Sequence, residues 1–279
     1  MPFTVSHVIA VIPFRKAGLP LLPLAVGSMA PDFFYFTPGH YGSMFGHSLA
    51  GVFLATLPMA WLVLWFFRCF LREPLLLLPP KRHQALLAEL AGDPPADSRW
   101  ARPGATALLL LAGIATHLFW DSFTHQEGVM VQHFAVLHTT MLPTPIGPLA
   151  LARVLQHGCS FAGLGMLAAW YLWLFHRRKT AGILPEPAAE QLPPRVRRLL
   201  RLALIAVAAI TAAAVFYHKS GNPEPGDTPR GHLMKSIWSG ITYGIMALFI
   251  AASAYSLAWR RKVHTRAGKI RDPADFDPN

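Results

Sequence analysis

The stretch GATALLLLAGIATHLFWDSF, residues 104–123, decides the fold class. A hydrocarbon bilayer core of about 30 Å is crossed by roughly 20 apolar residues in a helix, because each residue rises about 1.5 Å. This stretch has that length, and among Asp, Glu, Lys and Arg it contains only Asp121. It therefore predicts a transmembrane helix, and the polar side chains inside it need a separate explanation.

Four further stretches have the same character, and the composition of the whole chain agrees with them. The additional predicted spans are His47–Phe70, Leu149–Phe175, Leu199–Tyr217 and Ile237–Trp259. Hydrophobic residues make up 53% of the 279 residues and charged residues 14%, against roughly a quarter in soluble domains. Mean hydropathy is +0.36, and the two cysteines are too few for a disulfide framework. The sequence thus predicts an all-α polytopic membrane protein, and it excludes disorder and most cytosolic enzymes.

The N-terminal region is apolar but interrupted. Residues 19–36 contain three prolines, each of which removes a backbone donor and disturbs the preceding turn: Pro20, Pro23 and Pro31. We expect a broken or re-entrant helix here, sheltered by the other helices from lipid. The preceding residues 4–12 carry an apolar stripe and predict a short amphipathic helix on the membrane surface.

The basic residues orient the predicted spans. Six Lys and Arg lie in or beside the loop between the first two spans, residues 124–148 hold none, and seven lie in or beside the loop after the third span. Three more lie between the last two spans and six in the tail from residue 260 onward. By the positive-inside rule, the N-terminal region lies outside and the C-terminus lies in the cytoplasm. The basic residues then face anionic lipid headgroups, and we expect no nucleic-acid partner.

Chain organisation follows from this pattern, while the oligomeric state stays open. Residues 1–148 would contain the N-terminal helical region and the first two spans, and residues 149–259 three further spans. Residues 260–279 would form a basic cytoplasmic tail.

His117 and Asp121 are spaced to bind one ion together. They stand at positions i and i+4 of a predicted helix, hence on one face and about 6 Å apart along its axis. His125 lies one further turn along, about 12 Å from His117 on an ideal helix. It could join the same ion only if the helix ends or bends there, and Gly128 is a suitable residue for a helix end.

The predicted topology brings three more ionisable residues to the same membrane level. His47 opens the first span, and His7 and Asp32 precede it on the outer side, where the end of the second span also lies. Ionisable groups in membranes are costly and normally have partners. Histidine nitrogen and carboxylate oxygen are zinc ligands, so this set predicts a divalent metal site, with zinc favoured. In a catalytic site, His125 or Glu127 would transfer protons.

Two other interpretations stay open at this point. The same cluster could be a structural metal site, or a hydrogen-bonded clamp that joins the N-terminal segment to the spans. A metal or proton transporter would place ionisable residues at the bilayer midplane in several spans. The fourth predicted span, residues 199–217, has none at its middle, which disfavours a transporter.

The motifs around these residues resemble a known family. PFTVSHVIAVIP, GSMAPDFFYF, GHSLAG and THLFWDSFTHQEG are similar to the bacterial membrane family called domain of unknown function 4184. That family resembles inner-membrane proteins described as metal-dependent hydrolases, some of them as LexA-binding. The resemblance implies ligand or catalytic roles for the residues that match its motifs: His7, Asp32, His47, His117 and Asp121. His125 belongs to the longer form of the last motif, and Phe34 stands where the hydrolase group commonly has a second aspartate.

The expectation is therefore a multi-pass protein of the bacterial inner membrane that carries a metal site at its outer face. As an enzyme it would hydrolyse an ester or phosphoester, with a lipid or lipid-linked molecule as substrate because the site lies at headgroup depth. The alternative is a non-catalytic membrane protein with a structural metal or polar cluster.

Overall fold

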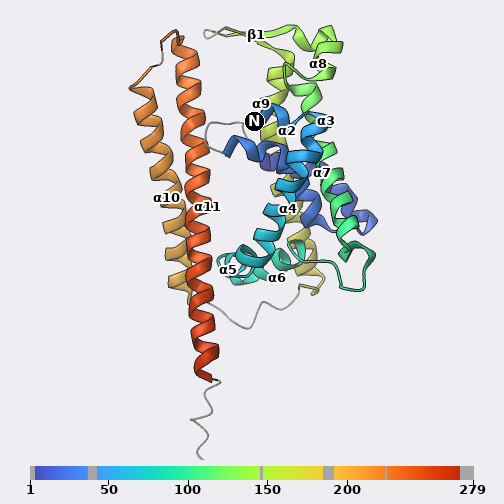
Figure 1. Cartoon of the computed structure of the whole chain (residues 1–279), viewed down its shortest axis with the longest axis vertical. Coiled ribbons are helices and arrows are strands. Elements are labelled where there is room, and N and C mark those ends of the chain that lie inside the picture. Colours follow the sequence, from blue (N-terminus) through green and yellow to red (C-terminus); the bar gives the residue numbers. More distant parts are fainter. Residues whose placement is uncertain (1–3, 37–42, 145–146, 185–191, 224, 271–279) are drawn as a thin grey trace, which may run out of the picture.

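Figure 1 shows the chain as a computed structural model, which describes residues 4–36, 43–144, 147–184, 192–223 and 225–270. Helices dominate the fold, and within the described residues a single two-stranded sheet accompanies them. Five helical stretches are long and apolar enough to cross a membrane: Leu49–Leu76, Pro103–His133, Leu151–Thr180, Pro194–Ser220 and Gly231–Val263. The predicted all-α polytopic membrane fold is thus confirmed, with each span 3–11 residues longer than expected.

Helix α7 (Pro103–Thr124) lies against helix α1 (Leu21–Met29), and glycines let the two backbones approach closely. A Cβ atom on Gly113 would lie 2.3 Å from the Leu24 carbonyl oxygen, and one on Gly27 would lie 2.2 Å from that of Leu110. Small residues at such contacts are typical of helix packing in membranes. This contact fixes the N-terminal segment beside the helix that carries His117 and Asp121.

The N-terminal segment is a helical hairpin inserted among the other helices. A 3-10 helix, η1 (Thr4–Ala17), reverses at Gly18, whose φ of 73° favours glycine, and α1 and η2 (Ala30–Phe36) return. Val8 and Val11 of η1 are buried against Leu24 and Leu109. The apolar stripe therefore packs on protein, whereas the sequence predicted that it would lie on the membrane surface. Residues 21–36 form an apolar helix too short to be a candidate span.

The first span is a continuous helix with two wider turns. After the short helix α2 (Ser43–Gly46), it comprises five consecutive elements: α3 (Leu49–Gly51), η4 (Val52–Thr56), α4 (Leu57–Phe66), η5 (Phe67–Leu71) and α5 (Arg72–Leu76). Both η4 and η5 are π-helical, and Pro58 and Pro74 follow them closely. Proline has no N–H to continue the α-helical ladder, which accounts for the wider turns. Ala60 and Leu64 pack against Leu110 and Ile114 of α7.

The end of the molecule opposite the β-hairpin is held by ion pairs. Helix α6 (Lys81–Leu90) and the 3-10 turn η6 (Arg99–Ala101) connect the first span to α7. Glu89 of α6 accepts a hydrogen bond of 2.8 Å from Arg15 at the end of η1, and another of 2.8 Å from Arg178. The turn of the N-terminal hairpin thus lies at the level of α6.

The segment 124–148 was predicted only as a loop, but its described residues include short helices and strands. Helix α8 (Val129–His133) and the 3-10 turn η7 (Ala135–His138) lead into strand β1 (Thr140–Thr144), which pairs antiparallel with β2 (Gly147–Ala150). Cα partners include Thr144 with Gly147 and Leu142 with Leu149. Helix α9 (Leu151–Thr180) then runs back along α7 and η1.

The last two helices form a separate hairpin beside this body (Figure 1). In α10 (Pro194–Ser220) and α11 (Pro229–Ile270), Gly240 and Gly244 approach the backbone of the partner helix, and α10 has no buried residue. Helix α11 contacts α5, where the Tyr255 hydroxyl donates to the Pro74 carbonyl at 3.2 Å. It continues to Ile270, so part of the predicted basic tail is helical.

Candidate metal centre

The His117 and Asp121 side chains lie one helical turn apart on the buried face of α7. His117 is fully buried and Asp121 is 6% exposed. The distance from His117 Nε2 to Asp121 Oδ2 is 3.1 Å. The i, i+4 spacing therefore produces the side-by-side arrangement expected of two ligands of one ion.

Asp32 and His47 reach the same place from two other segments. Asp32, in η2, is fully buried and places Oδ1 3.6 Å from His117 Nε2. His47, just before the first span, places Nε2 3.9 Å from Asp32 Oδ1 and 3.8 Å from Asp121 Oδ2. One donor atom from each of the four residues lies within 4.8 Å of all the others. This buried Asp/His cluster could bind a metal ion.

The donor atoms fit a metal better than they fit one another. Asp32 Oδ1, His117 Nε2 and both carboxylate oxygens of Asp121 are buried without a hydrogen-bond partner within the described residues. Leaving buried polar atoms unpaired is costly. In a tetrahedral zinc site, with bonds of about 2.0–2.1 Å, neighbouring donors lie about 3.3 Å apart. Four of the six separations are 3.1–3.9 Å and all six are within 4.8 Å, so the donors would have to draw closer together to reach that geometry.

Hydrogen bonds behind the cluster orient two of these side chains. His117 Nδ1 lies 2.8 Å from the Ser28 carbonyl oxygen, which can only accept, so Nδ1–H donates to it and Nε2 is directed at Asp32 and Asp121. The Thr4 hydroxyl donates to Asp32 Oδ2 at 2.8 Å and leaves Oδ1 directed at the cluster. Second contacts of this kind are typical of metal-binding histidines and carboxylates.

His7 lies against the cluster and contacts two of its members. Its ring stacks on that of His117 with centroids 4.0 Å apart, and its Nε2 is 3.6 Å from Asp121 Oδ1. Burial, together with the neighbouring His117, lowers the pKa of His7 to about 4. The ring is therefore neutral at neutral pH and places Nε2 next to the Asp121 carboxylate.

His125 joins the group because α7 ends immediately before it. The helix stops at Thr124, earlier than Gly128, and His125 is extended with φ −101° and ψ 141°. Its Nδ1 lies 3.5 Å from Asp121 Oδ2, and its Nε2 is 2.9 Å from the Gln156 amide nitrogen on α9. His125 thus contacts Asp121, but it is not one of the four residues whose donor atoms converge.

Glu127, the other predicted proton-transfer residue, is placed differently. Its side chain is exposed beyond the end of α7, and it is not one of the four residues whose donor atoms converge. Gly128 beside it is held close to α7, since a Cβ there would lie 2.5 Å from the Ser122 carbonyl oxygen.

Three contributors to the cluster lay outside the sequence-based set. Thr4, read in the sequence only as the start of a helix, supports Asp32, and Gln156 of α9 contacts His125. Ser28 contributes only its backbone carbonyl oxygen. The motif PFTVSHVIAVIP did contain Thr4, but a backbone carbonyl acceptor leaves no signal in a sequence.

Comparison with known proteins places the chain in one family. The family described as domain of unknown function DUF4184 matches residues 1–257, so the chain belongs to it. The match covers the first four candidate spans and most of the fifth, beyond the region of the motifs. No curated protein and no solved structure matches the chain.

Proposed function

We propose that this protein is a membrane-bound, zinc-dependent hydrolase that cleaves an ester or phosphoester bond of a lipid or lipid-linked molecule. The observation that carries the proposal is the convergence of donor atoms from Asp32, His47, His117 and Asp121, three of which are buried with donor atoms that lack hydrogen-bond partners among the described residues: Asp32, His117 and Asp121. Two further histidines lie next to them. Hydrolysis adds water across the bond and yields an acid and an alcohol. Asp32, His47, His117 and Asp121 would hold the metal.

The donor set favours zinc over magnesium or calcium. Two imidazole nitrogens and two carboxylate oxygens suit zinc, whereas the harder cations prefer oxygen ligands alone. When bound, zinc would polarise a substrate oxygen and lower the pKa of a water molecule. Departure of one weak ligand, or a fifth position, would be needed to admit that water.

His47 and His125 provide the accessible side of the centre. Their side chains are 25% and 24% exposed, whereas Asp32 and His117 are fully buried. His125 is in contact with Asp121 and within reach of the accessible edge, so we assign proton transfer to it. Its contact with Gln156 Nε2 holds the ring in place.

We further propose that the centre faces the outside of a bacterial inner membrane. In Figure 1, α8 and β1, which belong to the segment 124–148 without lysine or arginine, lie at one end of the body. Helices α5 and α6 and the end of α11 lie toward the other end. The positive-inside rule assigns the second end, with the C-terminus, to the cytoplasm. Asp121 lies three residues before the end of α7, on the side of α8.

A structural metal site is the second candidate, and one observation favours it. The four donors complete a tetrahedral set by themselves, as in structural zinc sites, and they come from three separate segments. Metal bound there would fasten η2 and the start of the first span to α7. A structural site would explain the four ligands but would give no chemical role to His7 and His125.

Metal analysis of the detergent-purified protein tests both candidates. We expect about one zinc per chain in the wild type, and loss of that zinc in His117→Ala and Asp121→Ala. The matched control is His232→Ala, which removes a histidine 3.5 Å from Asp227 in the α10–α11 hairpin. A wild-type protein without stoichiometric metal would overturn both candidates. Hydrolysis of a panel of phospholipids and lipid phosphates, lost in His125→Ala while zinc is retained, separates enzyme from structural site.

A further inference from the structure

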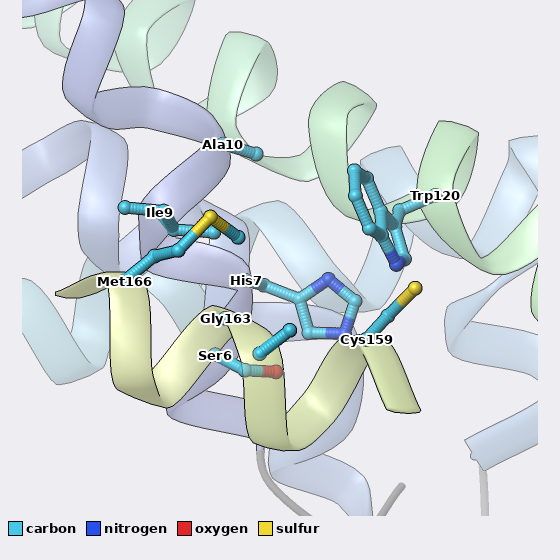
Figure 2. Close-up of a pocket in the computed structure, with 9 residues that line it drawn as sticks. Ser6, His7, Ile9, Ala10, Trp120, Cys159, Gly163 and Met166 are labelled. Atoms are coloured by element: carbon cyan, nitrogen blue, oxygen red, sulfur yellow. The ribbon is translucent and has the colours of Figure 1, made fainter. Parts of the chain in front are cut away.

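A small cavity is lined in part by His7. It measures about 90 Å³, and its nine lining residues come from η1, α7 and α9. Figure 2 shows Trp120 and Cys159 on one side of the His7 ring and Ile9 and Met166 on the other. Most of the lining is apolar. The polar groups among the lining residues are the side chains of Ser6 and His7, the Trp120 indole N–H and the Cys159 thiol.

The cavity opens toward the surface that lipid covers. Trp120 and Met166 at its edge are 38% and 51% exposed, and α7 and α9, which carry them, are both candidate spans. Phe161 and Leu172 on the outward side of α9 are 64% and 59% exposed. Apolar side chains exposed on a membrane-spanning helix contact hydrocarbon, so we infer that the exposed edge of the cavity, at Trp120 and Met166, faces the acyl chains.

His7 joins the cavity to the candidate metal centre. One ring lines the cavity, stacks on His117 at 4.0 Å and lies 3.6 Å from Asp121 Oδ1. Gly163 of α9 keeps this wall thin, since a Cβ there would lie 3.0 Å from Ser6 and η1 would have to move away. A molecule that fills the cavity therefore contacts the His7 ring, which itself contacts His117 and Asp121.

We propose that the cavity binds a segment of one acyl chain of a membrane phospholipid and thereby presents the lipid's ester group to the metal centre. This inference rests on the proposed function, which gives a lipid or lipid-linked ester as the substrate. It narrows that substrate class to phospholipids. A cavity of roughly 150 Å³ holds benzene, so this smaller one excludes a ring and admits a few methylenes. The apolar lining suits methylenes, and no charged side chain lines the cavity to pair with a headgroup.

Photocrosslinking tests the site without requiring hydrolysis. The full-length protein is reconstituted in nanodiscs of phosphatidylethanolamine and phosphatidylglycerol that contain a phosphatidylethanolamine with a diazirine in its acyl chain. Mass spectrometry after illumination locates the adducts. We expect enrichment on Trp120, Cys159 and Met166 over Phe161 and Leu172, which are exposed on α9 outside the cavity.

Two variants of neighbouring residues on α9 form a matched pair. Cys159→Phe fills the cavity, whereas Gly158→Phe adds the same ring where a Cβ meets nothing within 4 Å. Displacing about two buried methylenes lowers affinity by about tenfold, so cavity adducts should fall by that factor in Cys159→Phe only. Circular dichroism and size-exclusion chromatography confirm that both variants fold.

The outcomes separate this inference from the proposed function. Uniform adducts over α9, or equal adducts in both variants, would overturn the acyl-chain site even if the protein binds zinc and hydrolyses a lipid. Enriched cavity adducts that persist in His117→Ala, without hydrolysis of any lipid in the wild type, would support the chain site and defeat the hydrolase. Enriched adducts with phospholipid hydrolysis that falls about tenfold in Cys159→Phe support both.

Discussion

The body formed by residues 4–180 and the hairpin formed by residues 194–270 treat buried polar groups in different ways. In the hairpin, the buried Ser236 and Ser256 donate to the carbonyl oxygens of His232 and Ala252, four residues earlier on the same helix. In the body, Asp32, His117 and Asp121 keep buried atoms without hydrogen-bond partners. Both regions cross the same membrane, so burial alone does not explain the difference.

The contrast teaches which polar residues carry chemistry. A serine whose hydroxyl donates to a carbonyl oxygen of its own helix costs little free energy in a membrane and needs no partner from another segment. Carboxylate oxygens and imidazole nitrogens from different segments lie 3.1–3.9 Å apart in the body, a spacing that an ion bound between them would explain. Among the described residues of the hairpin, Arg201 Nε is likewise unpaired, but no second donor group accompanies it.

The largest expected effect comes from removing a ligand in the body. His117→Ala and Asp32→Ala should each lower zinc affinity by more than about 100-fold, because second contacts behind a ligand are already worth about 10–100-fold. Competition with a fluorescent zinc chelator measures the affinity. Ser236→Ala in the hairpin is the control, since it removes a hydroxyl bonded only to its own helix. Equal zinc affinity in all three variants and the wild type would erase the contrast between the regions.

The next effect tests whether close helix packing serves the cluster. Gly113→Val places side-chain atoms against the Leu24 backbone, 2.3 Å from a Cβ, and should cost about 3 kcal/mol or more because the backbones must separate. We expect a lower melting temperature in detergent and loss of zinc binding, since His117 follows one turn later on α7.

Gly244→Val is the matched variant in the hairpin, where a Cβ would lie 2.9 Å from the Ala208 carbonyl oxygen. It should lower thermal stability without changing zinc affinity. Loss of zinc binding in Gly244→Val as well would show that the two regions fold as one unit and that the comparison is too sharp.

Much of the fold could be predicted because membrane spans are set by length and hydropathy. All five spans were located to within several residues, and α7 differs by one residue at each end from the predicted helix of residues 104–123. The role of η1 could not be predicted. Val8 and Val11 form an apolar stripe, which suits a protein interior as well as a membrane surface, and only tertiary contacts decide between the two.

The candidate site shows the same division. The i, i+4 spacing of His117 and Asp121 and the distribution of basic residues were enough to bring the predicted ligands to one level. The position of His125 depended on where α7 ends, and helix ends are the least certain feature of a sequence. The contact from His117 to the Ser28 carbonyl oxygen depends on the Gly27–Leu110 approach, which no local pattern encodes.

A moderate effect is expected from the residue that supports Asp32. Thr4→Val keeps the shape of the side chain and removes the hydroxyl that donates to Asp32 Oδ2. Zinc affinity should fall by about 10-fold, the lower end of the range for second contacts, whereas Thr4→Ser should restore it. Unchanged affinity in Thr4→Val would show that Asp32 is positioned without Thr4 and that the contrast rests on the ligands alone.

The smallest effect concerns ionisable residues of the body that lie away from the cluster. Glu89→Gln weakens the contacts with Arg15 and Arg178, whose side chains are 29% and 20% exposed. Exposed ion pairs are worth about 0–1 kcal/mol, so the melting temperature should change little and zinc affinity should stay within about twofold of the wild type. This variant compares the two ends of the body, the ion pairs of Glu89 at one end and the Asp/His cluster at the other. A large loss of zinc in Glu89→Gln would mean that the turn of the N-terminal hairpin controls the position of Asp32 at its other end.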